Sequence, residues 1–493
     1  MPGFLPVGLQ DFMYRGQPGL RQEVAGQVHL FKVLGEGLAL DVASGSLHFV
    51  DEAAWEVIAA YCLGRAAILR QLGPRFGPRT VAEVWDEVNE LVQCGLLFTQ
   101  DPLPPALQAT RPLKALCLNV AHDCDLACSY CFAGRGEFRG PRGLMTREVA
   151  RSALHFLASN SGQVSSLEVD FFGGEPLLNF EVIRDTAEYA REFAKLTGKP
   201  FRFTVTTNGT HLTPDVMDFL SMQEFGVVLS LDGRKAVHDR HRRDRAGVGT
   251  YLRVVGPMLE LTRRRPAHTY YVRGTYTHQN LDFVEDVKHM AELGFLSLSL
   301  EPVVAFPHED YALRLEDMTA VENEYERLAD LYLREALAGR RFTFFHFEVD
   351  LHAGPCLPKR LTGCGAGVEY LAVAADGSLY PCHQFVGNPD FLMGHVDQGI
   401  QRPELAQRFR DCHAMSKTPC RTCWARYHCG GGCHASAHLL NQDMDRPYQL
   451  GCILQKKRLE CALYVQAKLS AANPASVTEN PGEYARMGAC EGE

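Results

Sequence analysis

The chain has 493 residues, of which 46% are hydrophobic, and its formal net charge is −9. At about 150 residues per domain this length predicts roughly three domains, and the modest charge argues against a nucleic-acid partner. No stretch approaches the ~20 apolar residues of a membrane span, and the first residues lack the basic and apolar regions of a secretory signal, so we expect a cytoplasmic protein without a membrane partner.

The N-terminal fifth of the chain predicts a small α+β module. Apolar residues alternate over residues 38–49 around a Ser/Gly turn, which is the pattern of a β-hairpin. Helical spacing over 51–61 and 80–92 predicts two helices, and 96–98 predicts a short strand. A hairpin with helices is compatible with a winged-helix-like module over residues 1–105.

The middle of the chain alternates strand and helix patterns. Strands are predicted at 113–120, 167–173, 202–207, 226–231, 268–276 and 296–301. Helices are predicted at 148–160, 180–196, 281–293 and 316–338. This alternation favours an α/β fold with a parallel sheet. Since eight units would be needed for a closed barrel, we expect a partial (β/α)6 barrel over residues 110–345, with functional side chains at the carboxyl ends of its strands.

Beyond about residue 346 the periodicity weakens. Ten of the 17 cysteines lie from Cys356 to Cys461, among Gly-rich turns. A segment with so little regular structure needs cross-links to stabilise its fold, and bound metal clusters would provide them. We therefore predict an irregular cluster-binding domain over residues 346–470 and a polar tail over 471–493.

Three cysteines follow the first predicted strand with the spacing C-x3-C-x2-C, at Cys124, Cys128 and Cys131. Iron–sulfur clusters normally take four thiolates, so three leave one iron open to an outside ligand. Zinc is the alternative, but it prefers a closed site of four ligands, and His122 is the only nearby candidate for the fourth. Disulfides are a weaker explanation of the 17 cysteines, because disulfide-rich proteins are usually small and secreted.

Polar motifs follow the next three predicted strands. Gly173 and Gly174 would let a ligand approach the backbone closely, and Glu175 can accept a hydrogen bond from an ammonium group. The third and fourth strands end in polar residues where a ribose or a carboxylate would lie, namely Asn208, Ser230 and Asp232. Each motif alone is also a common turn.

A second series of cysteines occupies the C-terminal part. Its members are Cys356, Cys364, Cys382, Cys420, Cys423, Cys429, Cys433 and Cys452. The spacing from Cys420 to Cys433 also suits a zinc ribbon, which remains an alternative. The other cysteines in apolar surroundings or without a recognised role are expected to be buried thiols, namely Cys62, Cys94, Cys117, Cys412 and Cys461.

The run from Cys124 to Cys131 resembles the signature of radical S-adenosylmethionine (SAM) enzymes. The resemblance implies a [4Fe–4S] cluster on these catalytic cysteines, with the amino and carboxylate groups of SAM on the open iron. It assigns Glu175 to the SAM amino group and Tyr130 to the neighbourhood of the adenine. It also suggests Arg242 for the SAM carboxylate, with Arg240 or Arg243 as alternatives.

The C-terminal series resembles the SPASM domain, which carries auxiliary clusters in peptide-modifying radical SAM enzymes. By this resemblance one cluster is held by Cys420, Cys423, Cys429 and Cys452. The other is held by Cys364, Cys382 and Cys433. Cys356 is a candidate fourth ligand, and without it the open iron would be free for a substrate thiolate. Three [4Fe–4S] clusters are thus implied.

The wider likeness, over about residues 30 to 465, is to the thioether-forming maturases of SCIFF peptides. It rests on motifs such as Tyr-Val-Arg-Gly-Thr at 271–275 and Tyr-Pro-Cys-His-Gln-Phe at 380–385. The resemblance implies a sactionine/ranthipeptide-type oxidation that joins a cysteine sulfur to the α-carbon of a threonine in a ribosomally made precursor peptide. Residues 1–105 would bind the leader of this peptide as an added strand. An electron donor such as flavodoxin or ferredoxin is also implied.

Three alternatives stay open. Sulfatase-type maturases, which form formylglycine, typically carry an aspartate directly after the residue that matches Cys382, where this chain has His383. Histidine can also accept a proton, so His383 argues against a sulfatase-type maturase without excluding it. A maturase that links cysteine to acidic side chains is the second alternative. A non-catalytic iron–sulfur carrier or sensor is the third, although it would not need the Gly-Gly-Glu-Pro motif.

Overall fold

The computed structural model describes residues 27–101, 111–349, 351 and 361–472. Cys356 and the predicted tail beyond residue 472 lie outside these ranges. The chain forms two compact units, Met1–Pro105 with Thr422–Trp424, and Ala106–Arg421 with Ala425–Glu493. Within the described ranges, no helix combines the length and the hydropathy that crossing a membrane would require.

The first unit pairs a small sheet with helices. Its strands are antiparallel in the order β1 (Val28–Val33), β2 (Glu36–Asp41) and β3 (Leu47–Val50). Its helices are α2 (Glu52–Ala59), η1 (Tyr61–Leu63), α3 (Arg65–Phe76) and α4 (Pro78–Gln93). The predicted hairpin and both predicted helices are confirmed. Strand β1 and helix α3 were not predicted, since Gly73 and Pro74 near the end of α3 hide its helical pattern. The strand predicted at 96–98 is wrong, because the chain turns there, with Gly95 and Phe98 at positive φ.

The second unit is built on a parallel sheet, so the predicted α/β fold is confirmed. Its six central strands are β4 (Ala115–His122), β6 (Leu167–Gly173), β7 (Phe201–Thr207), β8 (Gly226–Ser230), β9 (Tyr270–Tyr276) and β10 (Ser297–Pro302). Neighbours in this series pair in parallel. The short strand β11 (Thr343–Phe344) adds to β10 in parallel. At the other edge β12 (Tyr370–Val373) pairs in parallel with β4.

Short antiparallel strands complete this sheet. They are β5 (Gly143–Leu144), β13 (Ser378–Tyr380), β14 (Gly394–His395) and β15 (Gly399–Ile400).

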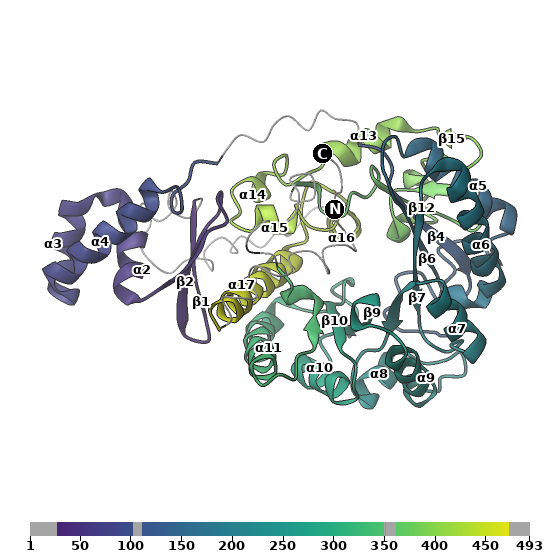
Figure 1. Ribbon diagram of the computed structural model, residues 1–493, viewed down its shortest axis with the longest axis horizontal. Helices are drawn as coiled ribbons and strands as arrows, with labels where there is room; N and C mark the ends of the chain where they lie inside the picture. The colour runs from purple at the N-terminus through teal and green to yellow at the C-terminus, as the bar shows by residue number, and fades with distance from the viewer. Residues whose placement is uncertain (1–26, 102–110, 350, 352–360, 473–493) are drawn as a thin grey trace, which may run out of the picture. The chain divides into compact units, whose positions relative to one another are not determined.

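Helices cover the outer side of the curved sheet (Figure 1). They are α5 (Arg147–Asn160), α6 (Phe180–Thr197), α7 (Pro214–Met222), α8 (Lys235–His241), α9 (Tyr251–Arg263), α10 (Phe283–Glu292) and α11 (Met318–Leu337). Four of them were predicted, whereas α7, α8 and α9 were not. In β6 buried residues alternate with half-buried ones, so Glu168, Asp170 and Phe172 face away from the helices. The inner side of the sheet is therefore lined with polar as well as apolar side chains.

The C-terminal part is more regular than predicted. It contains α13 (Pro403–Asp411), α14 (Thr418–Arg421), α15 (Arg426–Cys429), α16 (His434–Asn441) and the 24-residue α17 (Gln449–Ala472). Helix α17 packs against α11. Five consecutive residues of α17, 461–465, are buried. A helix buried on several sides has no apolar stripe, which explains why its sequence lacks the 3.6-residue period.

Candidate active site

The cysteine loop directly follows β4 and is held in place by the segment after α8. The backbone N–H of Ala127 donates to the carbonyl of Arg243 at 2.8 Å, and that of Ser129 donates to the carbonyl of His241 at 3.1 Å. The Ser129 hydroxyl also lies 2.7 Å from Nδ1 of His241. Backbone hydrogen bonds to a separate segment thus fix the conformation in which the three thiols are presented.

Gly173 and Gly174 bring the end of β6 onto the start of the cysteine loop. A Cβ atom on Gly174 would lie 2.2 Å from the carbonyl oxygen of Asp123, and one on Gly173 would lie 2.4 Å from that of Ala121. The N–H of Gly174 donates to the Ala121 carbonyl at 2.8 Å, and the N–H of Glu175 donates to the Asp123 carbonyl at 2.9 Å. The backbone that requires glycine here is that of the cysteine loop, which the sequence did not reveal.

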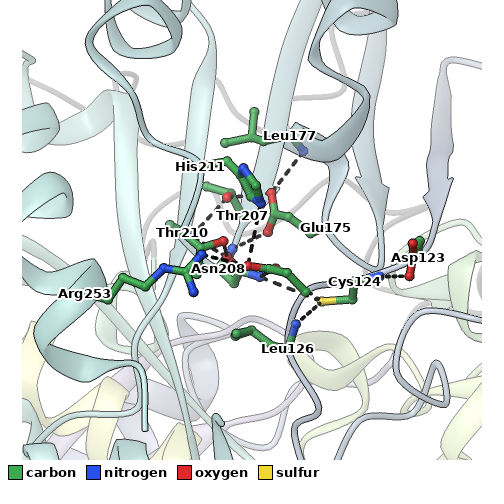
Figure 2. Close-up of polar contacts among 12 residues, drawn as sticks. Asp123, Cys124, Leu126, Glu175, Leu177, Thr207, Asn208, Thr210, His211 and Arg253 are labelled. Carbon is green, nitrogen blue, oxygen red and sulfur yellow. Dashed lines mark hydrogen bonds and ion pairs between the residues drawn. The ribbon is translucent and has the colours of Figure 1, made fainter. Parts of the chain in front are cut away.

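Glu175 is buried and joins three elements (Figure 2). Its Oε1 accepts from the N–H of Leu177 at 3.0 Å and from the hydroxyl of Thr207 at 2.8 Å, and its Oε2 accepts from the N–H of Asn208 at 2.8 Å. Burial raises the pKa of Glu175 to about 7, against the effect of these hydrogen bonds. A carboxylate offers about four acceptor positions, so about one remains for an outside donor such as an ammonium group.

Asn208 connects the end of β7 to the cysteine loop (Figure 2). Its Nδ2 donates to Oδ1 of Asp125 at 2.9 Å and lies 3.8 Å from Sγ of Cys124. Arg253 donates to Oδ2 of Asp125 at 3.2 Å. Burial would raise the pKa of Asp125, but hydrogen bonds from His211, Asn208 and Thr210 outweigh it and hold this pKa well below its usual range. The carboxylate between the first two cysteines is therefore ionised and fixed.

Asp232, just after β8, accepts hydrogen bonds from several groups in and around the cysteine loop. Its side chain is fully buried and accepts from Nε of Arg242 at 3.1 Å, from the N–H of Thr275 at 3.1 Å and from the hydroxyl of Tyr130. The guanidinium of Arg242 lies 5.5 Å from the centre of the Tyr130 ring. Burial raises the pKa of Cys128 to about 11, and Arg242 lowers it in part.

The three candidate arginines differ in their contacts. Arg240 donates to the carbonyl of Gln279 at 2.6 Å, and Arg243 donates to that of Asp239 at 2.9 Å. Arg242 is thus the one of the three paired with Asp232 beside the loop. Ser230 is half-buried at the end of β8, in register with Arg273 of β9.

His383 lies between the two predicted cluster regions, a position that the sequence did not reveal. It directly follows Cys382, and its ring centre lies 4.9 Å from that of Phe172 and 5.6 Å from that of Phe132, the residue after Cys131. Its Nδ1 is 3.4 Å from the hydroxyl of Tyr370. Burial, with Arg273 as a smaller cause, lowers the pKa of His383 to about 4. The imidazole is therefore neutral near pH 7.

The structure brings Cys364, Cys382 and Cys433 together. The thiol of Cys382 interacts electrostatically with both of the others, and these two interact with each other. Cys423 belongs to the first unit and Cys420, Cys429 and Cys452 to the second, so the other predicted ligand set stays a prediction. Among the described residues no three His, Cys, Asp or Glu side chains converge tightly enough to hold a single metal ion.

The remaining cysteines divide into two kinds. Cys117, Cys412 and Cys461 are buried, as predicted. The prediction is wrong for Cys62 and Cys94, which are exposed. They lie at helix ends, in η1 and at the C-cap of α4, where an apolar neighbourhood in sequence does not ensure burial.

A charged group on the inner side of β9 and β10 was not predicted from the sequence. Glu301 lies 3.0 Å from Nε2 of His346 and 3.1 Å from a guanidinium nitrogen of Arg458. Strand alternation could have placed Glu301 and Arg273 on the inner side. No sequence signal relates them to Arg458, which lies more than 150 residues further along the chain in α17.

The donor set of the cysteine loop fits an iron–sulfur cluster with an open iron. Three thiols share one rigid loop, and Sγ of Cys124 already receives the N–H of Leu126 at 3.4 Å besides the amide of Asn208. Hydrogen bonds to ligating sulfur are typical of such clusters. A parallel, partly closed α/β barrel with this loop after its first strand defines the radical SAM class of domain.

The comparisons with known proteins also indicate a radical SAM domain. Residues 118–291 match the family model described as the Radical SAM superfamily. The cysteine-type anaerobic sulfatase-maturating enzyme of Clostridium perfringens is 27% identical over 342 residues, which cover 65% of this chain and 89% of that protein. The radical SAM cyclopropyl synthase TigE of Paramaledivibacter caminithermalis is 20% identical over 419 residues, covering 79% and 84%.

Among solved structures, "Native anSMEcpe with bound AdoMet" has a TM-score of 0.61 and 22% identity, and the match covers 73% of this chain and 100% of that one. This likeness supports the fold. Residues 118–291 are therefore a domain of the radical SAM type, and the chain as a whole is similar to the anaerobic sulfatase-maturating enzymes and to other radical SAM enzymes.

Proposed function

We propose that the chain is a radical SAM maturase that forms an intramolecular thioether in a ribosomally made, cysteine-rich precursor peptide of the SCIFF type. The bond would join a cysteine sulfur to the α-carbon of a threonine. The observation that carries the proposal is His383, which follows Cys382 in the three-thiol group and contacts Phe132 beside Cys131. Cys131 and Cys382 also pack in the same apolar cluster, so the two groups of thiols are close enough to act on one substrate.

The cysteine loop would hold the first cluster, which together with SAM would supply reductive cleavage of SAM and removal of a hydrogen atom from carbon. Glu175 has about one acceptor position left for the SAM amino group. Tyr130, within the loop, would contact the adenine, and Arg242, beside the Tyr130 ring, would contact the carboxylate. Gly173, Gly174, Asn208, Ser230 and Asp232 would shape the site.

The group of Cys364, Cys382 and Cys433 would bind one auxiliary cluster, with Cys356 as a candidate fourth ligand. If Cys356 does not bind, a substrate cysteine could occupy that position. The set of Cys420, Cys423, Cys429 and Cys452 would bind the other cluster. Together these clusters would accept the electron that thioether formation releases.

The first unit would bind the leader of the precursor. A groove of about 510 Å³ runs beside β3, lined by Phe49, Val50 and Trp55 with Lys32, Glu36 and Glu52 at its polar side. Among the described residues β3 is an edge strand of this sheet, and we place the added strand of the leader there. Peptides commonly bind by adding a strand to such an edge. Two similar structures are those of anSMEcpe with a bound Kp18Cys or Cp18Cys peptide, which supports a peptide substrate.

The formation of formylglycine is the second candidate, because sulfatase-maturating enzymes are among the relatives. Mass spectrometry of a co-expressed cysteine-rich precursor separates the two reactions. Thioether formation removes about 2 Da and keeps the sulfur, because only hydrogen leaves the peptide; a disulfide gives the same change and is excluded by reduction. Loss of sulfur would instead identify formylglycine made from cysteine, and a loss of about 2 Da with every thiol still free to alkylate would identify formylglycine made from serine.

The enzyme class has its own test. Reconstituted protein with SAM and a reductant should release 5′-deoxyadenosine, and the Cys124→Ala variant should not. The exposed Cys94→Ser is the matched control and should behave as the unaltered protein. Turnover by Cys124→Ala would refute the assignment of the loop, and a lack of turnover in the unaltered protein would leave an electron carrier or sensor as the better explanation.

A further inference from the structure

Arg273 projects from the middle of β9 into the interior of the sheet. Its neighbours Val272 and Gly274 are buried, whereas Arg273 is exposed. On the same strand Tyr276 packs against Phe283 of α10 and Tyr325 of α11, which fixes the helix side of β9. Side chains alternate along a strand, so Arg273 must point to the other side.

Two neighbouring strands flank Arg273 on this side of the sheet. In the parallel register it stands beside Ser230 of β8 and Ser299 of β10. The hydroxyl of Ser299 lies 3.3 Å from Nε2 of His346, and this nitrogen lies 3.0 Å from Glu301. The positive charge of Arg273 also contributes to the lowered pKa of Glu301, His346 and His383.

Arg273 has no hydrogen-bonded anion of its own among the residues that the structure describes. Glu301, on the neighbouring strand β10, is engaged at 3.0 Å by His346 and at 3.1 Å by Arg458. Asp170, a carboxylate on the inner side of β6, accepts from the hydroxyl of Thr204. The two guanidinium groups around Glu301 exceed its single negative charge by one even when His346 is neutral.

We propose that Arg273 anchors a carboxylate of the peptide substrate, either an Asp or Glu side chain near the modified residue or the C-terminus of the peptide. The inference rests on the proposed function, since it names a recognition element of that same substrate. A guanidinium presents parallel donors that match a carboxylate, and an exposed arginine without a hydrogen-bonded anion is well suited to this use. Such an anchor would set which residue faces the cysteine loop.

The test measures the binding of three fluorescein-labelled heptapeptides to the full-length, cluster-reconstituted protein with SAM. All contain one cysteine. The first has an Asp and an amidated C-terminus, the second an Asn and an amidated C-terminus, and the third an Asn and a free C-terminal carboxylate. At least one carboxylate peptide should bind roughly tenfold more tightly than the neutral one, as expected for a charge-assisted pair. The first or the third peptide then identifies the source of the carboxylate.

Variants assign this preference to Arg273. Arg273→Gln should remove it, Arg273→Lys should keep part of it, and Arg273→Glu should prefer a peptide with Lys in place of Asp. The control Arg191→Gln, an exposed arginine on α6, should bind all peptides as the unaltered protein does. Iron content and circular dichroism verify that each variant is folded.

Two results would overturn the inference. One is the same affinity for all three peptides in the unaltered protein, or no binding of any of them. The other is a carboxylate preference that survives Arg273→Gln. If the unaltered protein still releases 5′-deoxyadenosine, either result removes the anchor and leaves the proposed enzyme class intact. A protein that cannot cleave SAM would instead fail the proposed function.

Discussion

Replacing Gly174 with alanine should displace the cysteine loop, because the new methyl group has no space. The added Cβ would lie 2.2 Å from the carbonyl oxygen of Asp123 and 2.9 Å from Cα of Gly136. The first distance is about 1.2 Å short of the 3.4 Å at which ordinary contact begins. Both obstacles are backbone, so no side chain can rotate to relieve the clash.

The cost of Gly174→Ala follows from this geometry. Overpacking typically destabilises a protein by about 1–3 kcal/mol, and immovable backbone places this site at or above the upper end of that range. Gly174 does not have a positive φ, so strain from a left-handed conformation does not contribute. We expect a loss of about 3 kcal/mol in the free energy of unfolding, and a loss of iron from the first cluster.

Gly256→Ala in α9 is the matched control. A Cβ atom at Gly256 meets nothing within 4 Å, and alanine is favoured over glycine inside a helix by about 1 kcal/mol. Urea unfolding and iron analysis of both variants give the comparison, with opposite signs expected for the two changes in stability. A Gly174→Ala protein with unaltered iron content and a stability within ~0.5 kcal/mol of the parent would refute the close-packing explanation.

Three further predictions concern charges and thiols. Asn208→Ala removes the donor to the half-buried carboxylate of Asp125 and to the sulfur of Cys124; it should cost about 1–3 kcal/mol and make the potential of the proposed first cluster more negative, and an unchanged potential in a redox titration would contradict this. Arg458→Gln leaves Glu301 without one partner and should cost about 3 kcal/mol at pH 7. Because the folded-state pKa of Glu301 is depressed, its stabilisation is present above the ordinary value of 4.5 and is lost as the pH falls below it, so the two proteins should converge in acid unfolding curves; a gap that persists there would count against the ion pair. Cys382→Ala should remove the iron of one auxiliary cluster while Cys94→Ser removes none, and equal iron contents would disprove the auxiliary site.

The sequence by itself determined the parts of the fold that depend on local pattern. All six central strands and six of the helices lie within a few residues of their predicted bounds, since alternation and helical spacing are properties of neighbouring residues. The spacing of Cys124, Cys128 and Cys131 likewise indicated a shared ligand without any knowledge of the fold. Helix α17 was not predicted, because a helix that is buried on several sides has no periodic stripe of apolar residues.

Only the tertiary structure decided which distant residues meet. The requirement for glycine at Gly174 comes from the Asp123 backbone, some fifty residues earlier in the chain. The neighbours of Arg273 come from β10, the segment after β11 and the region after β13, and the partner of Glu301 comes from α17. Such contacts depend on how whole elements pack, and a pattern in a short window of sequence carries no information about that packing.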